Sequence, residues 1–511
     1  MGGRLWLSRS LVATLSIAAG LIGCGGGGGA SAPAPASGGA PPVLGGPAST
    51  EVAFKVVDTS GRALPGVIVQ RRDIVGVEQA TTDANGRATL PTYVVAGIPL
   101  WEQHKEGFVT QLQKLFFSGV NGVITQSVVM MRRDTAVTLP DARTGGTVIG
   151  KHGLALTLAP NGLVSPGGPI EISLTPIDVA QSDIAAAPST TFRFTPWDYN
   201  DDSLLSYGMV ELVVRDTRTT TVAGLSQPAT IDIPLYVTQH PDGQPITAGQ
   251  RIAVATFDDG SRAYFDGQWQ PMGEGEVVIS AASPTGFALR ATIPSDDGAG
   301  KPRILNAHFS AIASVTGSRS VDVNIVPPAG ETLPSGSPYR VWGNVISRGG
   351  PQAAFDQGRA LSRDVGANGY LHSAWLSFDP AFDVRAEVVV GTATYLGTTQ
   401  IAAAPPHITR VQLSLRRIEQ LSPFITYPNG VASVRVGTIV SVKVEFSGPQ
   451  PNRVQLFADQ ILIGELTGQR AFYTFEWDTT GLSPATRRLS AVAHDATSSG
   501  RSSEVQIVLG N

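Results

Sequence analysis

Short runs of alternating apolar and polar residues recur from residue 51 onward, separated by turns rich in Gly, Asn and Asp. Val52, Phe54 and Val56 form the first run. A period of two places successive side chains on opposite faces of a strand, whereas a surface helix has a period near 3.6. Gly (58 residues) and Pro (36 residues) are both frequent, which fits short strands joined by tight turns. The sequence therefore predicts an all-β fold of tandem Ig-like β-sandwich modules.

The first 23 residues have the pattern of a secretory signal peptide. Arg4 and Arg9 precede an apolar run from Leu11 to Ile22, which is too short to span a bilayer. A positive start, an apolar run of this length and a small residue before the cut are the features that export and cleavage require. We expect residues 1–23 to be removed and the protein to be secreted.

The signal peptide ends in Leu21-Ile22-Gly23-Cys24, which resembles the bacterial lipobox. The resemblance implies cleavage between Gly23 and Cys24, and lipid such as palmitate on the sulfur and amine of Cys24. Cys24 is the only cysteine, so it cannot form an internal disulfide, and lipidation removes a lone thiol from an oxidising compartment. Several acyl chains would anchor the protein firmly to a membrane. The alternative is an ordinary signal peptide with an incidental cysteine, or a weak membrane anchor.

Two further features bear on where the protein resides. Residue 25 is Gly and not Asp, which the lipobox resemblance associates with the outer membrane of a Gram-negative bacterium. The rest of the segment 24–50 is almost wholly Gly, Ala, Pro and Ser, a composition with little apolar surface to bury. We expect a disordered tether between the lipid in the cell envelope and the first folded module.

Length and charge limit the remaining possibilities. The 511 residues suit about four modules of roughly 100 to 150 residues, arranged like beads on a string. Charged residues make up 15% of the chain and the net charge is -4, so no polycationic surface is available to bind nucleic acid. We expect no nucleic-acid partner.

The first module, residues 51–133, contains two similar turns. Asp58-Thr59-Ser60-Gly61 and Asp83-Ala84-Asn85-Gly86 lie in stretches that resemble the carboxypeptidase-regulatory-like domain, a small β-sandwich accessory. Tight turns place glycine at positive φ, which predicts this conformation at Gly61 and Gly86. The resemblance implies no peptidase activity for the module itself.

Residues 134–318 form one β-sandwich region or two subdomains, 134–230 and 231–318. The glycine pair at 145–146 and the alternation that follows resemble the β-sandwich shared by ankyrins and netrin receptors. The order of the later segments, from 229 to 277, resembles the extracellular part of cartilage intermediate layer proteins. This second resemblance implies a matrix or scaffold role.

The last two modules are residues 319–420 and 421–511. In the former, 341–345 and 367–370 faintly repeat motifs of the first module, so we interpret it as a degenerate copy. The latter has seven short strand patterns and resembles the bacterial Ig-like domain. Without a disulfide, its core should rest on buried apolar side chains such as Phe457, Phe475 and Trp477.

Two motifs resemble ligand sites. Residues 145–152 fit the phosphate-binding pattern GxxxxGK, but His152 stands where a Mg2+-binding hydroxyl is needed and a strand pattern follows, which favours a hairpin turn. Asp198, Asn200 and Asp202 have the spacing of the first oxygen ligands of a calcium loop, although the closing glycine and glutamate are missing. We interpret this segment as an acidic surface turn, with an irregular Ca2+ site as the alternative.

No catalytic residue or cofactor can be assigned. The sequence has no HExxH or GxSxG motif, and its seven histidines are scattered singly. We therefore expect a non-enzymatic envelope lipoprotein that displays its modules to matrix, polysaccharide or protein partners. We expect a core role for each of five aromatic residues, with stacking on sugars or peptides as the alternative: Trp101, Trp197, Tyr199, Trp269 and Trp375. The rival hypotheses are an exported hydrolase, with converging carboxylates or a Ser-His couple, and a passive spacer.

Overall fold

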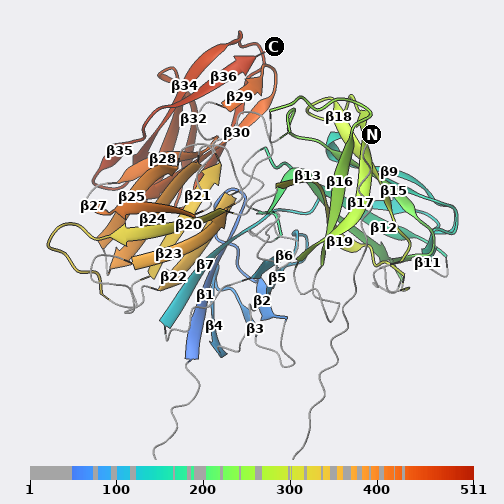
Figure 1. The fold of residues 1–511 in the computed structure, drawn as a ribbon, viewed down its shortest axis with the longest axis horizontal. Helices are drawn as coiled ribbons and strands as arrows, with labels where there is room; N and C mark the ends of the chain where they lie inside the picture. Colours follow the sequence, from blue (N-terminus) through green and yellow to red (C-terminus); the bar gives the residue numbers. More distant parts are fainter. Residues whose placement is uncertain are drawn as a thin grey trace, which may run out of the picture. The chain divides into compact units, whose positions relative to one another are not determined.

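The computed structural model describes residues 49–510, all within one compact unit (Pro47–Asn511), except for a set of shorter segments. These segments are 73–78, 94–99, 115–121, 165–166, 181–185, 189–202, 219–222, 241–242, 259–267, 297–299, 301, 316–318, 335–337, 346–353, 361–369, 377–381, 391–392, 402–407, 419–420 and 429–431. The described part consists of β-strands and one 3-10 turn, η1 (Lys151–Gly153) (Figure 1). It includes no helix long and apolar enough to cross a membrane. The predicted all-β fold of tandem β-sandwich modules is confirmed.

The first module consists of two facing sheets, of order β4-β1-β7 and β3-β2-β5-β6. The side chains of Val52, Phe54 and Val56 point inward from β1 and are buried, as their alternation predicts. Strand β1 pairs with β4 in antiparallel and with β7 in parallel orientation. The strands are β1 (Ser49–Asp58), β2 (Ile68–Arg71), β3 (Gln79–Thr81), β4 (Arg87–Tyr93), β5 (Leu100–His104), β6 (Gln111–Lys114) and β7 (Gly122–Met130).

Both predicted turns of this module are built by an aspartate. The Oδ1 atoms of Asp58 and Asp83 each accept the backbone N–H groups two and four residues further on. The hydrogen bond from the Arg87 backbone lowers the pKa of Asp83. Gly61 and Gly86 have φ of 75° and 71°, which confirms their predicted conformation.

The second module is built on a ten-stranded sheet of order β8-β12-β13-β19-β16-β17-β18-β15-β10-β9. Strands from before and after residue 230 share this sheet, since β13 pairs with β19, and β15, which spans residue 230, lies between β10 and β18. The two ends, β8 and β9, contact each other, so the sheet curls around one apolar core. The strands are β8 (Val137–Leu139), β9 (Gly146–Ile149), β10 (Ala155–Leu158), β11 (Leu163–Val164), β12 (Ile170–Ile177), β13 (Ser203–Asp216), β14 (Gly224–Leu225), β15 (Ala229–Pro234), β16 (Arg251–Asp258), β17 (Gln268–Ile279), β18 (Phe287–Ile293) and β19 (Asn306–Val315).

The third module has the strand order of the first. β20 pairs with β23 in antiparallel and with β26 in parallel orientation, as β1 pairs with β4 and β7. Likewise β21 lies between β22 and β24, as β2 lies between β3 and β5. This shared topology supports the interpretation of a degenerate copy. The strands are β20 (Arg319–Val326), β21 (Pro338–Val345), β22 (Ala354–Ala360), β23 (Tyr370–Leu376), β24 (Phe382–Val390), β25 (Ala393–Ile401), β26 (Ile408–Ser414) and β27 (Arg416–Ile418).

The fourth module has sheets of order β28-β30-β33 and β29-β36-β34-β31-β32. Phe475 and Trp477 are buried in its core, as predicted, but Phe457 is only half-buried. The prediction for Phe457 is wrong because its neighbours Leu456 and Ala458 occupy the inward face of β31. The strands are β28 (Ser422–Tyr427), β29 (Ala432–Arg435), β30 (Ile439–Ser447), β31 (Arg453–Ala458), β32 (Ile461–Thr467), β33 (Tyr473–Asp478), β34 (Ala485–His494), β35 (Ser499–Arg501) and β36 (Val505–Gly510).

Contacts between modules replace the expected beads on a string. Leu100, Val109 and Leu112 of the first module belong to one buried cluster with apolar residues of the second, including Trp269. The turn at 58–61 reaches the fourth module, where a Cβ on Gly61 would lie 2.1 Å from the carbonyl oxygen of Phe472. Independent beads would bury no side chains between them, so the expectation is wrong for these modules.

Candidate functional site

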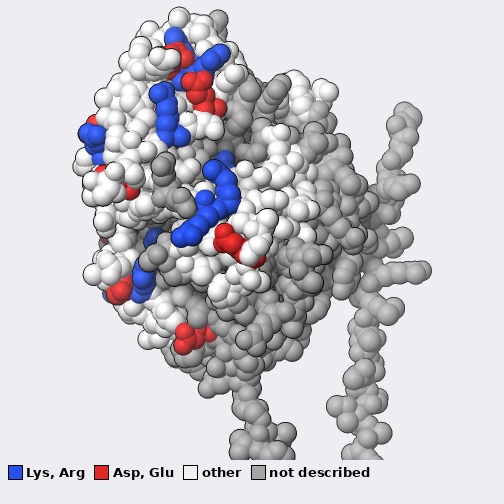
Figure 2. Space-filling view, turned by 90° about the vertical axis from the view of Figure 1, so that its left-hand side faces the viewer, with Lys and Arg blue, Asp and Glu red and all other residues white. Residues whose placement is uncertain are grey.

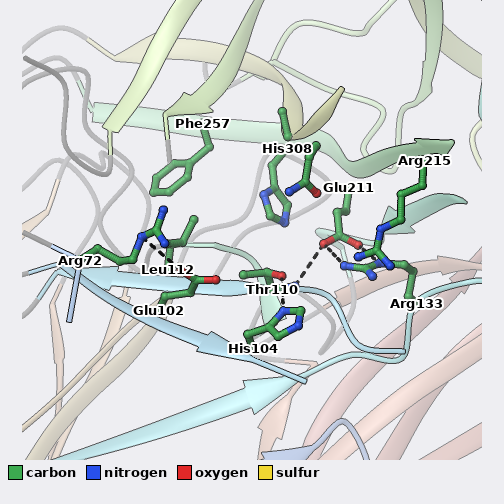
Figure 3. A pocket seen from close by; sticks show the side chains of 12 residues that line it. Arg72, Glu102, His104, Thr110, Leu112, Arg133, Glu211, Arg215, Phe257 and His308 are labelled. Atoms are coloured by element: carbon green, nitrogen blue, oxygen red, sulfur yellow. Dashed lines mark hydrogen bonds and ion pairs between the residues drawn. The ribbon is translucent and has the colours of Figure 1, made fainter. Parts of the chain in front are cut away.

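A cavity of about 270 Å3 lies where the first two modules meet. Strands β5 and β6 of the first module and β13, β16 and β19 of the second contribute to its wall (Figure 3). We call it the junction cavity. Its lining residues are Arg72, Glu102, His104, Thr110, Leu112, Arg133, Glu211, Arg215, Phe257, Asn306, Ala307 and His308.

Alternate side chains of a β-strand point to the same face, and this places the lining residues of each strand at the cavity. In β5, Glu102 and His104 lie two residues apart and share a face, whereas Trp101 faces the core of the first module. In the second module, Glu211 of β13 lies directly opposite His308 of the neighbouring strand β19. The β-sheet register therefore places a carboxylate beside an imidazole, and both face the first module.

A buried ion pair joins the two modules at the cavity. Glu211 accepts hydrogen bonds from Nε and Nη2 of Arg133 at 2.7 and 2.8 Å, and a third from the backbone N–H of Thr110 at 3.1 Å. The side chains of Arg133 and Glu211 are 9% and 2% exposed. Burial acts to lower the pKa of Arg133, but the hydrogen bonds and charge of Glu211 outweigh it and raise that pKa. We call this ion pair, whose two parallel hydrogen bonds fix its geometry, the Arg133–Glu211 clamp.

The other lining carboxylate, Glu102, is also engaged. Its Oε2 accepts a hydrogen bond from Nε2 of Gln70 at 2.9 Å, and the same oxygen lies 3.3 Å from Nε of Arg72. Nη1 of Arg215 lies 3.6 Å from Glu106, whose side chain is 80% exposed. The two cavity carboxylates thus converge from different modules, and each is held by an arginine.

The residues singled out from the sequence lie elsewhere. Gly23 and Cys24, and the metal candidates Asp198, Asn200 and Asp202, lie outside the described residues. No group of His, Cys, Asp or Glu side chains in the described ranges is arranged to hold a metal ion.

The expected core role is confirmed for two of the tryptophans. Trp101 and Trp269 are fully buried, and Trp101 packs against Phe54 with ring centroids 5.2 Å apart. Their strand register points them into apolar clusters, so no face is open to a sugar. Trp197 and Tyr199 lie outside the described residues, as does the side chain of Trp375.

The phosphate-loop-like stretch 145–152 is a hairpin. Strand β9 runs antiparallel to β10, and the turn between them holds His152 at φ 56°. Nδ1 of His152 lies 2.9 Å from the hydroxyl of Tyr236, and burial lowers the pKa of the imidazole. The hairpin prediction is confirmed.

Sequence reasoning missed the junction cavity. Arg133 and Glu211 are 78 positions apart, and no short motif links them. One signal was present: Glu211 is the single acidic residue within the apolar run 209–214 of a strand. A charge in such a run is costly unless a partner reaches it, and so it indicates a buried polar contact.

The chain is distantly similar to several solved structures. One is the structure of fibronectin(III)-like modules of Clostridium thermocellum CbhA, with 17% sequence identity and a TM-score of 0.16. That match covers 37% of this chain and 90% of the CbhA chain. Another is the major pilin subunit BcpA of Bacillus cereus, with 10% sequence identity and a TM-score of 0.16. That match covers 72% of this chain and 99% of the BcpA chain. No curated protein matches the chain. Residues 424–491 match the bacterial Ig domain family, which confirms the predicted identity of the fourth module.

Proposed function

We propose that this chain is a non-enzymatic lipoprotein of the cell envelope, anchored to the outer membrane through Cys24, that displays its modules for binding. The bacterial Ig domain at 424–491 indicates a surface or exported protein. The lipobox-like Leu21-Ile22-Gly23-Cys24 and the Gly/Pro-rich segment after it support an anchor and a tether. The partners proposed are polysaccharide, matrix or envelope proteins.

The observation that favours binding over hydrolysis in this proposal is the engagement of the two carboxylates that line the junction cavity. A carboxylate acts as a general acid or base only where one of its oxygens can exchange a proton with the substrate. Glu211 is 2% exposed and accepts three hydrogen bonds, and Glu102 is held by Arg72 and Gln70. An arrangement of fixed charged groups around a small cavity supports recognition of a ligand over hydrolysis.

A retention experiment tests the proposal. The full chain, extracted in detergent and immobilised, should retain envelope polysaccharide, a matrix protein or a protein from an envelope extract, and should leave the retained material intact. The heat-unfolded chain serves as the control and should retain none specifically. Time-dependent cleavage of the retained polymer would favour the hydrolase, and failure to retain any of the three would favour the spacer.

A further inference from the structure

The junction cavity offers more hydrogen-bond donors than acceptors. Three arginines and two glutamates line it, which leaves one positive charge in excess. A guanidinium carries five N–H groups and a carboxylate only accepts hydrogen bonds. Since Glu102 and Glu211 are already engaged, a ligand would meet mainly donor groups.

The excess charge is best assigned to Arg215. Arg133 is neutralised by the bidentate contact with Glu211, and Arg72 by the contact with Glu102. The partner of Arg215 is Glu106, at 3.6 Å and with 80% of its side chain exposed. Such an exposed, long pair contributes little, so Arg215 remains able to bind an anion.

The dimensions favour a small cyclic ligand. The cavity volume of about 270 Å3 lies just below the usual range for ligand pockets, about 300 to 1,000 Å3, which suits one monosaccharide unit and not an extended peptide. Figure 3 shows the ring of Phe257 and the imidazole of His308 pointing toward the cavity from the second module, with His104 on the opposite side. An apolar ring with imidazoles beside it matches the mixed apolar and hydroxyl surface of a sugar.

We propose that the junction cavity binds a single uronic-acid unit of an acidic polysaccharide, with the carboxylate of the sugar on Arg215. The inference rests on the proposed binding function and gives it a ligand class. The carboxylate accepts N–H groups from the guanidinium in a charge-assisted contact, while the sugar hydroxyls meet the imidazoles of His104 and His308.

Calorimetric titration of the full chain in detergent tests the inference, with galacturonate, galactose, acetate and a triglutamate peptide as probes. Galacturonate should bind at least about tenfold more tightly than galactose, because only the former makes the charged contact. In Arg215→Gln this preference should be lost. Arg251→Gln is the matched control, since Arg251 makes a similar exposed pair with Glu276 at 3.7 Å and does not line the cavity; it should keep the preference.

Several results would overturn the inference. If galactose bound as tightly as galacturonate, the carboxylate would not contribute to binding. If acetate bound as tightly as galacturonate, the sugar ring would not contribute. Preferred binding of triglutamate would point to a peptide. An unchanged preference in Arg215→Gln would place the site elsewhere, and the absence of galacturonate binding would refute a uronic-acid site. If the chain still retains polysaccharide in that case, the proposed function stands and only the assignment to this cavity fails.

Discussion

Replacing Glu211 by Gln should destabilise the protein by about 3 to 5 kcal/mol, because it leaves the buried Arg133 guanidinium without its counter-charge. Gln keeps the size of the side chain and one acceptor oxygen, so the loss reports the charge and one of the two hydrogen bonds from Arg133, at 2.7 and 2.8 Å. Urea unfolding of the full chain, followed by tryptophan fluorescence, measures the effect as a lower midpoint of the transition.

Asp232→Asn is the control for this prediction. Asp232 also accepts two hydrogen bonds from one arginine, Arg290, but the side chain of Arg290 is 58% exposed. An exposed pair of this kind contributes about 0 to 1 kcal/mol, so the midpoint should shift little. Equal shifts for Glu211→Gln and Asp232→Asn would show that burial does not set the strength of the clamp.

Trp269→Ala should cost about 3 to 5 kcal/mol through the loss of a large, fully buried side chain and the cavity that this loss leaves. Trp269 packs edge-to-face on Phe257, with ring centroids 5.3 Å apart and an interplanar angle of 67°. Because Phe257 lines the junction cavity, the variant should also weaken galacturonate binding. Urea unfolding and calorimetry measure the two effects.

Ile279→Ala on the same strand, β17, gives the contrast. Ile279 is 79% exposed, so its truncation should change the stability by no more than about 0.5 kcal/mol and leave ligand binding as it is. A Trp269→Ala variant as stable as Ile279→Ala would contradict the assignment of Trp269 to the buried cluster between the first two modules.

The strands were predictable because they depend on local pattern. The alternation of Val52, Phe54 and Val56 predicts one inward face, and these residues are buried. The Asp-x-x-Gly turns likewise depend on contacts within four residues, and both have the expected glycine conformation. Local chemistry was sufficient for these features.

The junction cavity was not predictable, because it depends on which modules pack together. Nothing near Glu211 in the sequence identifies Arg133 as its partner, or Leu100 and Leu112 as members of the same apolar cluster as Trp269. The prediction that Phe457 lies in the core of the fourth module failed for a related reason. Hydrophobicity placed it in the core, but the strand register, which is set by its neighbours in the sheet, turns it away from the core.

On the face shown in Figure 2, acidic and basic side chains lie near one another at several places. The net charge of -4 gives the chain no long-range attraction for an anionic polymer. Selection of an acidic sugar would therefore depend on a local, enclosed contact such as that at Arg215, while the membrane anchor would hold the modules at the surface.

The central claim, that this is a lipid-anchored envelope protein, is tested most directly by metabolic labelling with radioactive palmitate. The wild-type chain should incorporate label and remain in the membrane fraction, and Cys24→Ala should incorporate none and be released, because Cys24 is the only cysteine in the chain. Label and membrane retention that survive Cys24→Ala would contradict the claim.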